Sequence, residues 1–89
     1  MDPYMKKTAA LLRQGRVRLD SLSVRMHTEA LAFSALARRR KLMNLEARYA
    51  EASRRFEMLR AAGTEGVADL KVGLEKALDM FQSEIGWKP

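Results

Sequence analysis

Apolar residues recur along the first part of the chain at spacings of three, four and seven, the period of one face of an α-helix. This first stripe consists of Met5, Leu12, Leu19, Leu22, Met26, Ala30 and Phe33, with Thr8 and Gly15 on the same face. A second stripe with heptad spacing follows at Leu42, Leu45, Tyr49, Ala52, Phe56 and Leu59. The pattern predicts an all-α protein with a coiled-coil or helical-bundle arrangement.

The first helix is expected to be very long. Between Asp2 and Ala62 the chain contains one proline, Pro3, and one glycine, Gly15, among residues that favour helices. Proline is compatible with a first helical turn, so we expect one helix from about residue 3 to about residue 62. At about 1.5 Å per residue it would measure about 88 Å, so other helices must cover its apolar stripe.

A turn is expected at residues 63–66, where Gly63 suits a helix C-terminus and Thr64 an N-cap. A second helix at about 67–85 would then fold back as a hairpin. The expected hairpin seam is Leu42, Leu45, Tyr49, Phe56, Leu59, Val67, Leu70, Leu74 and Phe81. An unbroken helix with a stutter at this point is the alternative. In either case residues 1–89 form a single helical domain.

The hairpin leaves the first half of the long helix without a partner in its own chain. The exposed apolar residues would be Leu12, Leu19, Leu22, Met26, Ala30, Phe33 and Leu36. Such a patch is too large for a monomer, so we expect a homodimer or higher oligomer. The simplest arrangement is antiparallel, centred on residues 30–37, where nearly every side chain is small or apolar.

The charge is uneven along the chain. The protein carries a net +6: residues 1–60 have fourteen Lys or Arg and six Asp or Glu, and residues 61–89 have three and five. Candidate contacts for an acidic protein or an anionic surface are Arg38, Arg39, Arg40, Lys41, Arg48 and Arg55. The alternative is a solvated face with local Glu51–Arg55 and Arg54–Glu57 pairs.

Nothing in the sequence indicates an enzyme. His27 is the only histidine, and Ser23 four residues earlier has no orienting carboxylate beside it. The chain lacks cysteine, metal-ligand clusters and phosphate-binding loops, so we expect no catalytic residue, cofactor, metal or small-molecule substrate. With no secretory signal and no apolar run near the roughly 20 residues of a membrane span, a cytoplasmic location is expected.

One segment carries a family resemblance. Residues 59–78 contain Asp69, Leu70, Lys71, Gly73 and Ala77 at the spacing D-L-K-x-G-x-x-x-A, preceded by a small-residue turn. This segment resembles the C-terminal part of small bacterial coiled-coil proteins described as stress-associated, although Val67 and Leu78 stand where those proteins usually have aromatic residues. The resemblance implies a cytoplasmic helical protein of unestablished biochemical activity.

The sequence therefore predicts a non-enzymatic, self-associating coiled-coil protein with a structural or protein-interaction role. The runner-up is a peripheral binder of anionic membranes or hydrophobic granule surfaces, similar in logic to phasins or apolipoproteins, since long basic amphipathic helices can lie in such an interface. Non-specific binding of nucleic acid through the same arginines is a third alternative.

Overall fold

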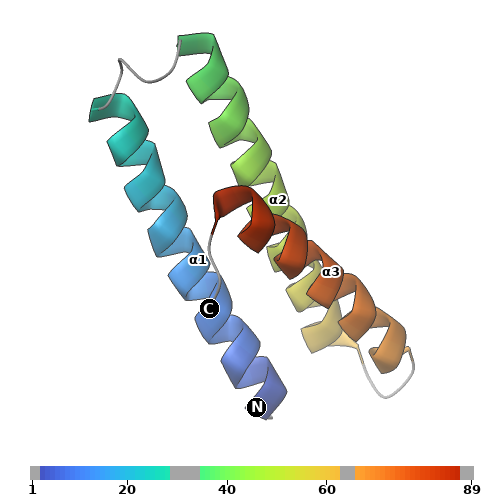
Figure 1. Cartoon of the computed structure of the whole chain (residues 1–89). Coiled ribbons are helices and arrows are strands. Elements are labelled where there is room, and N and C mark those ends of the chain that lie inside the picture. The colour runs from blue at the N-terminus through green and yellow to red at the C-terminus, as the bar shows by residue number, and fades with distance from the viewer. Residues whose placement is uncertain (1–2, 29–34, 63–65, 87–89) are drawn as a thin grey trace.

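The computed structural model describes residues 3–28, 35–62 and 66–86, and within these ranges it contains three α-helices. They are α1 (Pro3–Thr28), α2 (Ala35–Ala61) and α3 (Val67–Ile85). α1 and α2 run antiparallel, side by side, and α3 returns along α2 to end beside the middle of the α1–α2 pair (Figure 1). The result is an elongated bundle of 50 × 19 × 18 Å.

The prediction of a single helix over residues 3–62 is wrong. α1 has 26 residues and α2 has 27, and the chain reverses direction between Thr28 and Ala35. Reversal lets the apolar stripe of α1 pack on its own chain, whereas a straight rod would leave that stripe in water. We predicted a continuous helix because the residues of this region favour helices. Helix propensity alone, however, does not decide where tertiary packing ends a helix.

The chain also breaks between α2 and α3, which agrees with a hairpin and not with an unbroken, stuttering helix. The expected roles of Gly63 and Thr64 lie outside the described residues. Gly66 precedes α3 with a φ of 71°, the left-handed region that favours glycine, and its carbonyl accepts a hydrogen bond from the Leu70 N–H at 3.0 Å. At the other end Gly86 (φ 72°) donates its N–H to the Gln82 and Ser83 carbonyls.

The core contains two clusters of buried side chains. The larger consists of Met5, Leu12, Ala52, Phe56, Leu59, Leu74, Ala77 and Leu78. In the smaller cluster each helix contributes one residue, Leu19, Leu45 and Phe81, of which the two leucines are fully buried. The Tyr49 ring packs against both clusters and meets Phe81 edge to face at 5.5 Å. The three helices thus share a core within one chain.

This core changes the interpretation of the first stripe. Leu12, Leu19 and Met26, which the sequence assigned to an oligomer interface, are buried inside the single chain. Leu22 is half-buried, Leu36 is exposed, and Ala30 and Phe33 lie outside the described residues. The expectation that α1 has no partner in its own chain is therefore wrong, because α2 and α3 cover its apolar face.

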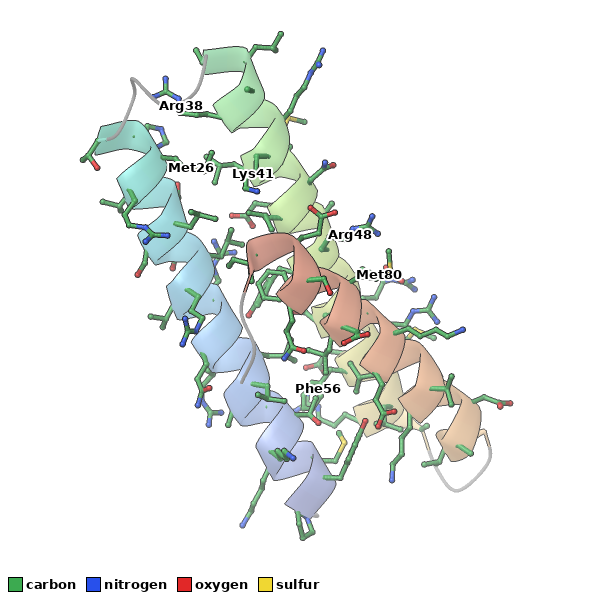
Figure 2. All side chains as sticks on the ribbon, in the orientation of Figure 1. Met26, Arg38, Lys41, Arg48, Phe56 and Met80 are labelled. Carbon is green, nitrogen blue, oxygen red and sulfur yellow. The ribbon has the colours of Figure 1, made fainter. Side chains whose placement is uncertain are left out.

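The expected hairpin seam lies at the α2–α3 contact and its surroundings. Five of its members are buried: Leu45, Phe56, Leu59, Leu74 and Phe81. Tyr49, Val67 and Leu70 are half-buried and pack against the larger cluster. Leu42, in the first part of α2, is also half-buried. Phe56 points into the space enclosed by the helices (Figure 2).

Candidate interaction surface

Arg16 is the main polar link between α1 and α2. Its guanidinium donates two hydrogen bonds to the Glu46 carboxylate, at 2.8 and 2.9 Å, and also contacts Asp20 at 2.6 Å. The same guanidinium lies 5.2 Å from the centre of the Tyr49 ring. Hydrogen bonding to Arg16 lowers the pKa of Glu46 and raises that of Arg16. One arginine thus satisfies two acids and fixes the register of the two helices.

We call the six predicted contacts the basic cluster (Arg38, Arg39, Arg40, Lys41, Arg48 and Arg55), and two of them contact other helices of the same chain. Arg38 reaches from α2 to the end of α1, where it donates to the Met26 carbonyl at 3.1 Å (Figure 2). This places a cation at the negative end of the α1 dipole. Arg48 lies against the Met80 sulfur on α3, with a nitrogen–sulfur distance of 3.8 Å. These two predicted contacts for an external partner are therefore engaged within the chain.

Local ion pairs neutralise much of the remaining charge on α2. Glu51 accepts hydrogen bonds from both Arg54 and Arg55, each with a shortest contact of 2.8 Å, and these bonds lower the pKa of its carboxyl group. The expected Glu51–Arg55 pair is thus present. The expected Arg54–Glu57 pair is not, because Arg54 turns to Glu51 while Glu57 pairs with Arg60 at 3.0 Å.

Arg39 and Arg40 differ from the rest of the basic cluster. Both are exposed, and within the part of the chain that the structure describes neither takes part in an ion pair. Lys41 is half-buried. Arg39 and Arg40 belong to the first part of α2 (Ala35–Ala61), the part of that helix that extends past the end of α3 (Figure 1).

A row of exposed residues runs along α2 on the side opposite the core. We call it the outer face of α2. Its members recur at alternating spacings of four and three and are all exposed: Leu36, Arg40, Met43, Ala47, Ala50, Arg54, Glu57 and Ala61. Leu36 is 57% exposed and Met43 is 64% exposed. Residues at these spacings lie on one face of an α-helix, so the row presents five apolar side chains, two arginines and a glutamate to the same side.

The outward side of α1 is strongly basic. Its cations are Lys6, Lys7, Arg13, Arg18 and Arg25, and Val17 and Val24 are exposed among them. The only acidic residue of α1 is Asp20, which contacts Arg16. The cations of α1 therefore outnumber its one acidic residue, and this side of the helix carries a net positive charge.

The acidic residues of α3 are exposed as well. Asp69, Glu75, Asp79 and Glu84 lie on its solvent side. Glu75 accepts a weak hydrogen bond from the Tyr4 hydroxyl at 3.4 Å. Among residues 3–28, 35–62 and 66–86, no ion pair joins these carboxylates to the basic cluster, so α3 does not serve as its acidic partner within the chain.

The predictions about catalytic and metal-binding residues can be compared with the surroundings of His27. A shallow pocket near the end of α1 is lined by His27, Ala35, Arg38, Arg39, Leu42, Met43 and Glu46. The His27 Nδ1 lies 2.7 Å from the Ser23 carbonyl oxygen, so this ring nitrogen donates to the backbone and not to the Ser23 hydroxyl. The described residues include no group of three metal-ligating side chains.

Within the described ranges, no helix has the length and hydropathy that crossing a membrane demands. No family model, curated protein or solved structure matches the chain. The resemblance carried by residues 59–78 consequently stays a prediction.

The sequence-based predictions did not include the outer face of α2. The same helix carries a stronger apolar stripe, from Leu42 to Leu59, and that stripe forms the core. The second row includes two arginines and a glutamate, so it does not stand out by hydropathy. The signal that could have revealed it is the presence of Leu36, Met43, Ala47 and Ala50 on the face of the helix opposite the core stripe.

Proposed function

We propose that this protein is a non-enzymatic helical bundle that associates with itself and acts as a structural or protein-interaction module. The observation that carries the proposal is the outer face of α2, on which the large apolar side chains Leu36 and Met43 are exposed. We place the protein in the cytoplasm as part of the same proposal, since a chain without cysteine suits a reducing compartment. A stress-associated role is what the resemblance of residues 59–78 adds.

The small size of the bundle supports self-association. A chain of 89 residues builds a limited core, and a second buried surface adds stability that such a core lacks. Leu36 and Met43 are large apolar side chains left more than half exposed. Burying a fully exposed residue of this kind stabilises by about 1.5 to 3 kcal/mol, so covering the exposed part of both side chains contributes to association.

Sedimentation equilibrium tests the proposal directly. The wild-type protein is expected to exceed the 10.1 kDa mass of one chain at micromolar concentrations. Met43→Lys, which places a charge in the row, should return the protein to the monomer mass. Val17→Lys is the matched control, because Val17 is equally exposed but lies on α1. A wild-type protein that stays monomeric up to millimolar concentration would refute the proposal.

A second candidate function is favoured by the outward side of α1. Its five lysines and arginines, with Val17 and Val24 between them, suit an anionic membrane or granule surface. Flotation with vesicles that contain anionic lipid, compared with zwitterionic vesicles, tests it. Binding to the anionic vesicles alone, lost on Arg18→Glu, supports this function, whereas retention on DNA at low salt would favour the nucleic-acid alternative.

A further inference from the structure

We propose that two copies of the chain pair through the outer face of α2 in one antiparallel register, with Ala47 of one copy opposite Ala50 of the other. This inference rests on the proposed self-association and specifies its geometry. The arrangement has a two-fold axis, so each contact occurs twice. The partner that this face accepts is therefore a second copy of the same chain.

The register follows from matching the row with its own reverse. Facing residues in the antiparallel pair would be Leu36 with Ala61, Arg40 with Glu57, Met43 with Arg54, and Ala47 with Ala50. Large side chains thus face small or flexible ones along the whole helix. At the axis, the two alanines allow the helix backbones to approach closely, since interaxial distance depends on the side chains at the contact.

Charge selects this register over the alternatives. Arg40, which takes part in no ion pair within the described residues, comes opposite Glu57 of the second copy. Glu57 pairs with Arg60 in its own chain, and its side chain is 58% exposed, which leaves room for a second donor. Parallel pairing would instead set Arg40 against Arg40 and Arg54 against Arg54, and like charges oppose association.

Sliding the helices by one turn also loses the charge match. A slide in one direction moves Arg40 opposite Arg54 of the second copy, and a slide in the other moves it opposite Ala61. Neither position provides a carboxylate. The Arg40–Glu57 contact therefore fixes the position of one helix along the other.

Arg54 is compatible with a place in the row because its charge is already satisfied. It donates three hydrogen bonds to the Glu51 carboxylate, at 2.8, 3.0 and 3.1 Å, and one of its nitrogens lies 3.6 Å from the Met58 sulfur. The ion pair holds the guanidinium, so its methylene stem is available to cover Met43 of the second copy.

Two single charge reversals provide the test. Arg40→Glu and Glu57→Arg each place like charges across the interface twice, and each should raise the dimer dissociation constant about tenfold or more. Mixed together, the two variants are expected to form a heterodimer, because each introduced charge then meets its opposite. The double variant, with both changes in one chain, should dimerise as the wild type does. Sedimentation equilibrium measures all four samples.

Arg13→Glu is the matched control, since it makes the same charge change at an exposed position of α1. It should leave the dissociation constant unchanged, and circular dichroism should show the same helix content for every variant. A wild-type dimer whose affinity is restored neither by mixing nor by the double variant overturns this register while leaving self-association intact. A wild-type protein that is monomeric at every concentration overturns both.

Discussion

At the scale of single residues, Arg16 connects more of the molecule than any other polar side chain described above. It joins α1 to α2 through Glu46, binds Asp20 within its own helix and lies over the Tyr49 ring. Tyr49 in turn packs against both core clusters. Through the Tyr49 ring, the Arg16–Glu46 ion pair at the surface is therefore in contact with the apolar core.

Arg16→Ala is expected to lower the free energy of unfolding by about 1 to 2 kcal/mol. An exposed ion pair contributes up to about 1 kcal/mol and a cation–π contact adds about 0.5 to 1 kcal/mol. Urea denaturation followed by circular dichroism measures the change. Arg13→Ala, an exposed position of the same helix, should change stability by less than about 0.5 kcal/mol.

The Glu46 carboxyl gives this contact a pH dependence. Hydrogen bonding to Arg16 lowers the pKa of Glu46 below its ordinary value of 4.5, so the folded state favours the charged form. The stabilisation is therefore complete above pH 4.5 and is lost as the pH falls through the lowered pKa. Denaturation in urea across this range should show a shallower acid decline for Glu46→Gln than for the wild type. Equal slopes would show that Glu46 contributes nothing.

At the scale of helices, both ends of α3 depend on a backbone conformation that most residues avoid. Gly66 and Gly86 both have φ values near 70°, and they lie directly before and after α3. Glycine adopts this conformation without the steric penalty of a Cβ atom. These two positions therefore mark where the third helix begins and ends.

Gly66→Ala should lower the free energy of unfolding by about 1 to 2 kcal/mol, the penalty of a left-handed conformation for an ordinary residue. An added Cβ would meet no atom within 4 Å, so the effect comes from the backbone and not from a clash. Gly66→Asn is the control. Asparagine adopts the left-handed conformation more readily than alanine, so this variant should lose less stability than Gly66→Ala. Thermal unfolding compares the three proteins; a loss as large for asparagine as for alanine would exclude the conformational explanation.

At the scale of the whole molecule, reversal between α1 and α2 shortens the protein and gives it a core. The bundle is 50 Å long with a radius of gyration of 14.8 Å, whereas one helix over residues 3–62 would measure about 88 Å. The outer face of α2 and the basic side of α1 remain exposed on this compact bundle.

Small-angle scattering of the Met43→Lys variant, expected to be monomeric, tests this shape. Its radius of gyration should lie near 14.8 Å, with an allowance of a few ångströms for hydration, and its maximum dimension near 50 Å. The compact values follow from α1 packing on α2 in the same chain. A maximum dimension near 88 Å would instead support a single extended helix over residues 3–62.

The sequence by itself determined the helical class, the heptad of Leu45, Phe56 and Leu59 as a buried face, and the location of the break before Val67. These are local properties, because periodicity, glycine and side-chain size act within a few turns of one helix. Only the tertiary structure decided that α1 folds back. Leu12 and Leu19 need burial in either arrangement, and the pattern of their spacing is the same whether the cover is a second copy or α2 and α3 of one chain. Which cover forms depends on contacts between residues distant in sequence, such as Arg16 with Glu46, that no local pattern contains.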